Sequence, residues 1–187
     1  MALLRTPEPV LGSRAPNFSL ADGEGRQFTR DGLLGEKGLV VMFICNHCPY
    51  VKAIRARLVR DCHELIEMGF GVVAINSNDG TAYPEDSPLR MVELAKEFEY
   101  PFPYLVDISQ DVARAYGAVC TPDFFGYNRQ LELQYRGRLD AGHAGPRTAG
   151  MQHDLLDAMR EVAQTGQGPI IQQPSMGCSL KWISARV

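Results

Sequence analysis

Two cysteines lie three positions apart in the segment FICNHCPYV, residues 43–51. An amide and the imidazole of His47 stand between Cys45 and Cys48, and Pro49 follows the second cysteine. In the first turn of a helix, residues at this spacing have Cβ atoms roughly 5–6 Å apart, whereas a disulfide needs about 3.5–4.5 Å. A small local adjustment would close the bond, so the segment predicts a redox-active thiol pair.

The residues on either side of the pair predict a strand and a helix that favour a reactive thiolate. The continuous apolar run at 38–45 is typical of a central strand covered on both faces. Apolar residues recur every three or four positions over 50–68, which predicts an amphipathic helix. Pro49 suits the first position of that helix and makes Cys48 the expected N-cap. Unpaired N–H groups at a helix start stabilise a thiolate, and His47 would add a second donor or a cation.

The rest of the chain alternates predicted strands with predicted helices. Residues 17–30 alternate apolar and polar side chains around the turn signal DGEG, which predicts an opening β-hairpin. The later elements are, in order, a strand at 70–78, a helix begun by Ser87 and Pro88 that runs to about residue 100, a strand at 102–107, a short helix at 109–117, two strands that meet near Asn128, and an amphipathic helix at 148–166. This order predicts an α/β fold with a parallel centre, in which the thiol pair lies at the carboxyl end of a central strand.

Length and composition predict one ordinary globular domain. The chain has 187 residues, of which 45% are hydrophobic and 22% charged. A net charge of −3 gives no electrostatic reason to expect nucleic acid or an anionic membrane as a partner. No segment approaches the roughly 18 apolar residues that span a bilayer, and Pro7 and Pro9 interrupt the apolar N-terminal start, so we expect a soluble cytoplasmic protein. We expect residues 1–166 to form the domain and 167–187 to form a tail that packs on or near it.

The other cysteines do not match a disulfide scaffold or a closed zinc site. The chain has five cysteines with only one close pair. A structural zinc site needs four ligands and usually a second close pair. The remaining candidate ligands are scattered singly: Cys120, Cys178, His143 and His153. Cys62 lies on the apolar stripe of its helix, which favours a place in the core. We therefore predict no metal site.

A metal carrier is nevertheless the alternative from another class of function. Soft thiolates suit Cu(I) or zinc, and Cys45 with Cys48 would supply two of them. His47 or Cys120 would complete the set of ligands. In the simplest alternative for His47, its imidazole is exposed to solvent and has no role in the chemistry.

The motifs APNFSL, GLVVMFICNHCPYV, AVCTPDFF and YRGRL occur in an order that resembles the thioredoxin-like superfamily. The resemblance extends from about Ala15 to Gly166, and it is to the branch that joins peroxiredoxin-like AhpC/TSA proteins with thiol-disulfide interchange proteins. Within that branch, the chain is most similar to bacterial thioredoxin-like proteins that carry a CNHCPY motif. The resemblance implies a thioredoxin fold, which is an α/β architecture with a central mixed sheet flanked by helices, here with an N-terminal β-hairpin extension.

The resemblance also implies roles for individual residues. Cys45 would attack a substrate disulfide, and Cys48 would resolve the mixed disulfide that forms. Pro122, which follows Thr121, would be the cis-proline that faces the pair and offers its backbone to an extended substrate.

Two further thiols are placed near the site by the same resemblance. Cys120 abuts the cis-proline loop and would lie near Cys45, either as a third active-site thiol or as a buried structural residue. Cys178 lies in a tail that could fold back over the site and act as a resolving thiol, or it is a free and mobile cysteine. The strand ends at 76–78 and 104–107 would also lie near the site.

The activity that the resemblance implies is thiol-disulfide exchange. The partners would be protein or small-molecule disulfides and a thiol electron donor. No organic cofactor is needed, because a dithiol carries its own two electrons. Ile44 and Met42 stand where thioredoxin has an aromatic and a buried acidic residue, so a reductase as potent as thioredoxin is not expected. A histidine directly before the second cysteine instead resembles the CPHC site of a bacterial disulfide oxidase, which predicts a potential above that of thioredoxin.

A peroxiredoxin-like peroxidase with antioxidant activity is the alternative enzyme. Cys48 followed by proline resembles a peroxidatic cysteine, although the positions of that family's threonine and proline hold Cys45 and Val41 here. Cys48 would then pass through a sulfenic acid and be resolved by Cys45.

Overall fold

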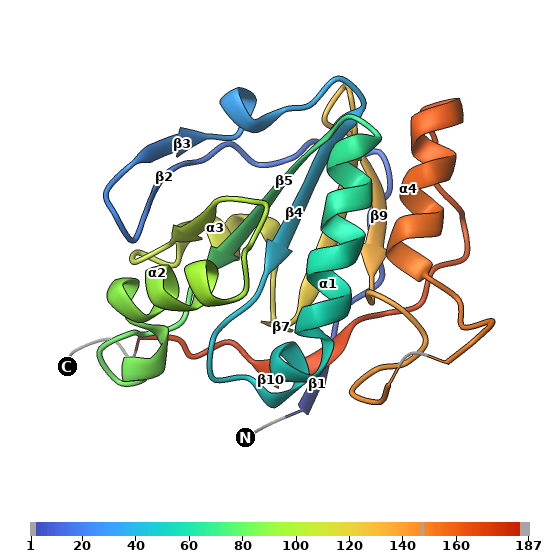
Figure 1. The fold of residues 1–187 in the computed structure, drawn as a ribbon. Coiled ribbons are helices and arrows are strands. Elements are labelled where there is room, and N and C mark those ends of the chain that lie inside the picture. Colours follow the sequence, from blue (N-terminus) through green and yellow to red (C-terminus); the bar gives the residue numbers. More distant parts are fainter. Residues whose placement is uncertain (1–2, 147, 184–187) are drawn as a thin grey trace.

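A seven-stranded mixed sheet forms the centre of the protein in a computed structural model that describes residues 3–146 and 148–183. Its strands are β2 (Ser19–Asp22), β3 (Gln27–Thr29), β4 (Gly38–Phe43), β5 (Phe70–Asn76), β6 (Tyr104–Val106), β8 (Asp123–Asn128) and β9 (Leu133–Gly137). They lie in the order β3-β2-β6-β5-β4-β8-β9 (Figure 1). The three central strands β4, β5 and β6 are parallel, and the remaining pairs are antiparallel. The predicted mixed sheet with a parallel centre is confirmed.

The predicted N-terminal hairpin is the pair β2 and β3. Leu20 lies opposite Phe28 in its antiparallel register. Asp22 closes the turn because its Oδ1 accepts hydrogen bonds from the backbone N–H groups of Glu24 and Arg26, at 2.9 and 3.0 Å. An Asp side chain that bonds to the backbone two residues ahead is a common turn device. The hairpin extends the sheet through the pairing of β2 with β6.

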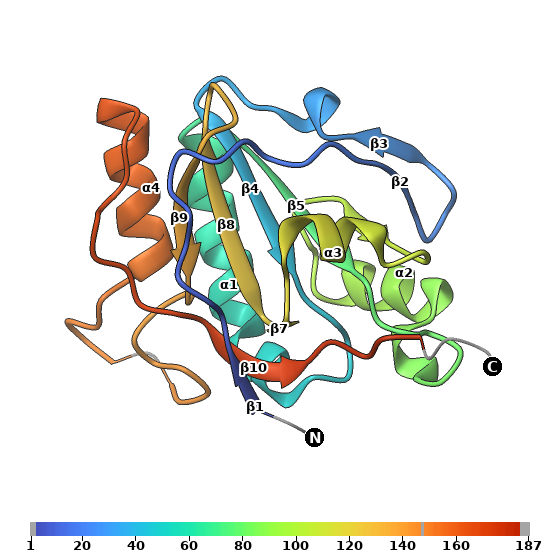
Figure 2. The same cartoon turned by 180° about the vertical axis from the view of Figure 1, so that it is seen from behind.

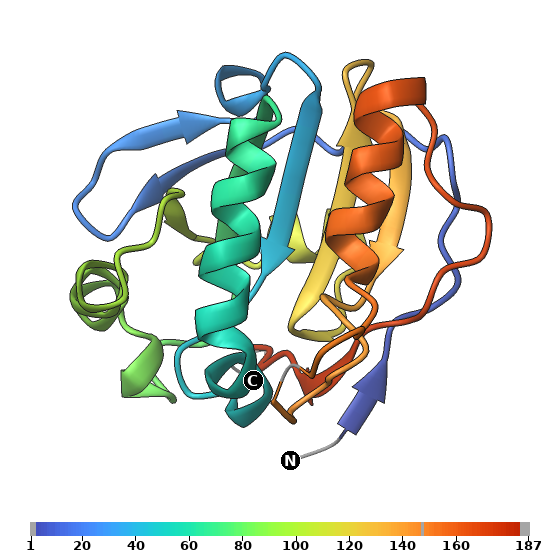
Figure 3. The same ribbon diagram turned by 45° about the vertical axis from the view of Figure 1, so that its right-hand side comes forward.

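Helices cover both faces of the sheet. They are α1 (Pro49–Glu67), α2 (Pro88–Glu97), α3 (Asp111–Tyr116) and α4 (Asp154–Thr165), with short 3-10 turns η1 (Asp31–Leu33) and η2 (Pro84–Asp86). Helices α1 and α4 lie side by side over one face (Figure 3), and α3 lies over the other (Figure 2). Strand β4 serves both layers: Val40 and Met42 pack in the core under α1, and Val41 and Phe43 pack in the core under α3. Because successive strand side chains point to opposite faces, a strand buried on both sides must be apolar throughout.

A second, three-stranded sheet lies beside the start of α1. Its strands are β1 (Leu3–Arg5), β7 (Cys120–Thr121) and β10 (Met176–Ser179), in the antiparallel order β1-β10-β7. Figure 2 shows β1 and β10, from opposite ends of the chain, meeting at this end of the molecule. The sequence does not predict β1 or β10, because each is too short to show a period.

The last helix begins later than its apolar spacing predicts. The predicted span was 148–166, but α4 starts at Asp154. Gly150 has a φ of +77°, and His153 has non-helical angles as the N-cap residue, so the helix cannot extend backwards through them. Met151 instead packs against the loop at Gly142, and its spacing to Leu155 is a coincidence of sequence.

No helix within the described ranges is both long enough and apolar enough to cross a bilayer.

Candidate active site

The two cysteines of the pair lie at the junction between β4 and α1. Cys48 is the N-cap of α1, with extended angles of φ −66° and ψ 121°, and Pro49 is the first helical residue, as predicted. Neither cysteine is in a disulfide in this structure. Cys45 is 1% exposed and Cys48 is fully buried, so the pair is covered by protein on all sides.

Thr121 connects both thiols to the cis-proline loop. The Thr121–Pro122 peptide is cis, as predicted. The Sγ atom of Cys45 lies 3.3 Å from Thr121 Oγ1, and the Sγ atom of Cys48 lies 3.2 Å from the carbonyl oxygen of the same residue. The antiparallel register of β4 and β8 pairs Phe43 with Asp123 and so holds the two segments side by side. Two segments that are distant in the sequence, one with Cys45 and Cys48 and the other with Thr121 and Pro122, therefore form one compact site.

The two thiols of the pair have pKa values that are shifted in opposite directions. Interactions with Cys45, Thr121 and the backbone N–H of Val51, the one with Cys45 being the largest, together lower the pKa of Cys48 to about 4 against the effect of burial. The same interaction between the two thiols, together with burial and the nearby charge of Asp86, raises the pKa of Cys45 well above its usual value. The negative charge of the pair thus lies on Cys48 at the start of α1, where helix N–H groups favour it.

The first testable consequence is a thiolate that persists in mild acid. We expect the reduced pair to release its first proton near pH 4, and the second only well above pH 9. The ultraviolet absorbance of thiolate, followed against pH, measures this step. Cys48→Ser should abolish the step near pH 4. Cys62→Ser should leave it unchanged, because burial raises the pKa of Cys62 well above its usual value. A wild-type step near pH 9 alone would show that the pKa values of the pair are not separated in this way.

His47 is held by an acidic residue that the sequence did not single out. Its Nδ1 atom lies 2.6 Å from Oδ2 of Asp86 in η2, and its ring stacks on Tyr83 with 4.9 Å between centroids. The side chain of His47 is only 9% exposed, so the solvent-exposed alternative is wrong. Its Nε2 atom is buried and has no hydrogen-bond partner among the described residues.

Asp86 is the centre of this polar cluster. Its carboxylate also accepts hydrogen bonds from the backbone N–H of Asn46 at 2.7 Å and from Nδ2 of Asn78 at 2.9 Å. Burial would raise the pKa of Asp86, but the hydrogen bonds from His47 and Asn78 outweigh burial and lower it. The only sequence signal for this residue was an acidic side chain in the polar loop before Ser87, which is too common a pattern to predict a site.

One donor atom each from Cys45, His47 and Asp86 lies within 4.8 Å of the other two. As a metal site this arrangement fits poorly, because His47 and Asp86 already bond directly to each other. The metal-carrier alternative used Cys45 and Cys48 with His47 or Cys120; this group of three contains Cys45 and His47, but Asp86 stands in it in place of Cys48 or Cys120. The imidazole and the carboxylate beside Cys45 are instead groups that can accept a proton from a thiol and return it.

The predicted strand ends lie beside the pair. The hydroxyl group of Tyr104, in β6, donates to the carbonyl oxygen of Ile44 at 3.4 Å and to Oδ1 of Asn46 at 3.1 Å. Asn78, which follows β5, donates to Asp86. Both strand ends therefore support the loop that carries the cysteines.

The remaining cysteines take three different places. Cys62 is buried, with its thiol 3.8 Å from the sulfur of Met42, and so belongs to the core as predicted. Cys120 is buried in β7 and points its thiol toward the carbonyl oxygen of Pro122 at 3.8 Å. Cys178, in β10, lies opposite Thr121 and packs in the same buried cluster as Cys48.

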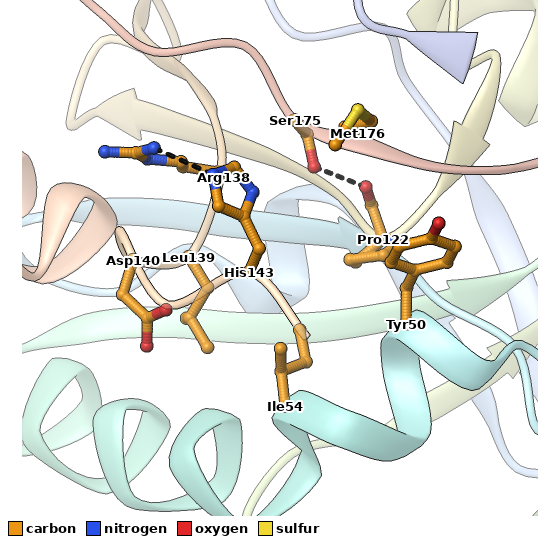
Figure 4. A pocket seen from close by; sticks show the side chains of 9 residues that line it. All are labelled: Tyr50, Ile54, Pro122, Arg138, Leu139, Asp140, His143, Ser175 and Met176. Carbon is orange, nitrogen blue, oxygen red and sulfur yellow. Dashed lines mark hydrogen bonds between the residues drawn. The ribbon is translucent and has the colours of Figure 1, made fainter. Parts of the chain in front are cut away.

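A groove lies beside the cis-proline (Figure 4). Helix α1 contributes Tyr50 and Ile54, and the tail contributes Ser175 and Met176. The loop after β9 supplies the other wall with Arg138, Leu139, Asp140 and His143. Ser175 Oγ donates to the carbonyl oxygen of Pro122, which fixes the tail against the proline. The groove is largely apolar at the proline and polar at its outer wall.

Comparison with known proteins is consistent with this geometry. The AhpC/TSA family matches residues 11–140. An uncharacterised conserved protein from Geobacillus kaustophilus is 40% identical, with a TM-score of 0.93 over 100% of this chain and 99% of that one. The thiol-disulfide oxidoreductase ResA of Bacillus subtilis is 24% identical over 155 residues, which are 83% of this chain and 79% of ResA. A thioredoxin domain from Bacteroides vulgatus, at 15% identity, shares the fold with a TM-score of 0.57 over 69% of this chain and 89% of that domain.

Proposed function

The chain belongs to the AhpC/TSA family, and we propose that it is a thiol-disulfide oxidoreductase that reacts through Cys45 and Cys48. The observation that supports this most directly is a pair of buried thiols that both contact Thr121, beside a cis-proline. Two thiols in this relation can form a disulfide by a small movement and give two electrons to a substrate. ResA, the relative named above, carries the same activity in its name.

The reaction begins when the proton of Cys45 passes to Cys48. The Cys45 thiolate attacks one sulfur of a substrate disulfide, a mixed disulfide forms, and the other half of the substrate leaves as a thiolate that takes up a proton. Cys48 gives up the proton that it received, and its thiolate attacks the sulfur of Cys45, which releases the second half as a thiolate and leaves the Cys45–Cys48 disulfide. A thiol electron donor reduces this disulfide again.

His47 and Asp86 would manage the proton during these steps. Asp86 accepts the bond at Nδ1 and leaves Nε2 of His47 without a partner among the described residues. A neutral imidazole with this orientation can accept a proton at one nitrogen while the carboxylate stabilises the cation that results. His47 and Asp86 would together take the proton-transfer role of the buried acidic residue of thioredoxin. Met42 stands at the position of that residue here.

A redox titration tests the proposed function. Purified, metal-stripped protein is equilibrated in graded glutathione buffers, its thiols are alkylated, and mass spectrometry locates each protected cysteine. We expect one two-electron transition that links Cys45 to Cys48. A midpoint near about −270 mV would make the protein a reductant like thioredoxin, and one nearer about −120 mV, which we expect from His47, an oxidant. If the two thiols never pair, the proposed mechanism is wrong.

A peroxidase is the second candidate, favoured by the thiolate on Cys48. A cysteine with a lowered pKa at a helix start is the kind that peroxide oxidises. Cys48 would form a sulfenic acid, and Cys45 would attack it to give the same disulfide and water. Rapid loss of the Cys48 thiol in dilute peroxide, one equivalent per protein, would support this activity, and slow loss comparable to that of free cysteine would exclude it.

A further inference from the structure

Strand β10 places a third thiol against the reactive pair. In the antiparallel register of β10 and β7, Cys178 lies opposite Thr121, the residue that contacts both thiols of the pair. Cys45, Cys48 and Cys178 belong to one buried cluster, and interactions with both Cys45 and Cys178 lower the pKa of Cys48. The three cysteines therefore meet around Thr121, at the start of α1.

Hydrogen bonds of the backbone hold β10, and with it Cys178, beside the reactive pair. The N–H of Thr6 donates to the carbonyl oxygen of Ser175 at 3.0 Å, and the N–H of Leu180 donates to that of Val119 at 3.1 Å. Beyond the strand, the N–H of Lys181 donates to Oδ1 of Asn78 at 2.8 Å. Cys178 is only 3% exposed. It is therefore a built part of the site and not a mobile cysteine in a loose tail.

The backbone edge that β10 occupies is the edge next to the cis-proline. An extended segment that adds to a free sheet edge is a common mode of peptide binding. Strand β10 takes that position within the same chain, and it brings a cysteine to Cys48 as a bound substrate segment would.

We propose that Cys178 is a third redox thiol, which moves the disulfide from Cys45–Cys48 to Cys48–Cys178. The inference deepens the proposed function and rests on it for the first disulfide. The Cys178 thiolate attacks the sulfur of Cys48, a Cys48–Cys178 bond forms, and the Cys45–Cys48 bond breaks. The electron pair of the broken bond leaves on Cys45, which takes up the proton that Cys178 lost. No external oxidant or reductant is consumed, and Cys45 is again free to react.

The charges of the site make this exchange depend on oxidation. Burial raises the pKa of Cys178, and the interaction with the negatively charged Cys48 raises it further, to about 11. When Cys48 enters a disulfide, that charge is lost, and Cys178 becomes easier to ionise. The positive charge of Lys181 favours the thiolate in both states. Cys178 is therefore a protonated, unreactive thiol in the reduced protein, and it ionises more easily and can attack in the oxidised one.

The test uses Cys45→Ser, in which the first disulfide cannot form. In oxidised glutathione, we expect Cys48 and Cys178 to link within one chain, which mass spectrometry of the digested protein detects. Cys45→Ser with Cys120→Ser should form the same link, because Cys120 points toward Pro122. Cys45→Ser with Cys178→Ser should not. Glutathione on Cys48 beside a free Cys178 would overturn the proposal.

The wild-type protein gives a second measurement that does not depend on the stability of a variant. Prolonged alkylation of the oxidised protein traps Cys45 whenever exchange frees it, so alkylated Cys45 and the Cys48–Cys178 link should accumulate together. Their absence, with Cys45–Cys48 intact throughout, would refute the exchange and leave the proposed function standing. If Cys45–Cys48 never forms in the wild type, the proposed function itself fails.

Gly177→Ala tests whether the position of β10 matters. A Cβ at Gly177 would lie 2.0 Å from the carbonyl oxygen of Thr121, which is backbone and cannot easily move. In the Cys45→Ser background we expect the equilibrium constant for the Cys48–Cys178 link to fall about tenfold or more, because the effective concentration of Cys178 at Cys48 drops. Ile171→Ala, in an exposed part of the tail, should leave it unchanged. Equal constants for both variants would contradict a role for the strand's position.

Discussion

Cys48→Ser should stop turnover and trap a mixed disulfide between Cys45 and its substrate, whereas Cys45→Ser should stop turnover without trapping one. Both variants lose a thiol that the reaction needs, so the rate should fall by several orders of magnitude, as when a catalytic nucleophile is removed. The difference lies in which step remains possible. With Cys48 replaced, the first attack occurs but no thiol is in place to resolve it.

The structure gives a reason to expect that Cys45 can still attack in Cys48→Ser. The largest cause of its raised pKa is the interaction with Cys48, which disappears with that thiolate. Burial and Asp86 still oppose ionisation, so the first attack should be slower than in a free thiol at neutral pH. Mass spectrometry of the protein after reaction with a disulfide of known mass measures the adduct. Cys62→Ser is the matched control and should keep wild-type turnover, since Cys62 lies in the core.

The opposite result would identify a different chemistry. If Cys45→Ser reacts with the substrate as fast as the wild type and Cys48→Ser forms no adduct, then Cys48 is the first nucleophile, as in the peroxidase alternative. In that case the adduct in Cys45→Ser should be short-lived, because Cys178 contacts Cys48 and can displace it. The lifetime of the adduct in Cys45→Ser with Cys178→Ser would then be longer.

The sequence predicts the central part of the site because its signals are local. An apolar run, a proline and a periodic stripe define β4 and α1, and Cys48 must then cap the helix. The chain order of strands and helices predicts the parallel centre, since few topologies connect such elements without left-handed crossovers. The cis state of Pro122 is predicted by family resemblance and not by the local sequence, because few X-Pro bonds are cis and an isolated one gives no sign of it.

The elements that escaped prediction depend on partners far away in the chain. Strand β10 contains Gly177 and shows no period, and it exists because β7 and β1 pair with it. Asp86 is an ordinary acidic loop residue until the fold brings it to the backbone of Asn46 and the ring of His47. Cys178 could be proposed as a nearby thiol, but its contact with Cys48 requires the register of β10. Non-local pairing of this kind leaves no pattern in a single sequence.

Replacing Asp86 with alanine should cost about 3–5 kcal/mol of stability. Its buried carboxylate accepts hydrogen bonds from Asn46, His47 and Asn78, and all of them would be left without this acceptor. Chemical denaturation of the reduced protein measures the loss. The neighbouring Glu85→Ala is the control, because that side chain is 62% exposed and pairs only with Lys52 at the surface. A loss of less than about 1 kcal/mol in Asp86→Ala would show that the cluster is not stabilising.

The pH dependence of that loss has a definite sign. The pKa of Asp86 in the folded protein lies below its usual value of 3.8, so its ionised form stabilises the fold. This contribution is fully present above the unfolded value, near pH 4, and it is lost as the pH falls through the lower folded pKa. The stability difference between wild type and Asp86→Asn should therefore be constant at neutral pH and shrink below about pH 4.

Asp86→Asn also separates a redox role from a structural one. The negative charge of Asp86 contributes to the raised pKa of Cys45, so its removal should lower the pKa of that thiol. The second proton of the pair would then be released at a lower pH, which thiolate absorbance detects independently of stability. If Asp86→Asn changes the stability but not this second step, Asp86 only supports the loop, and the proton during exchange must be handled by other groups.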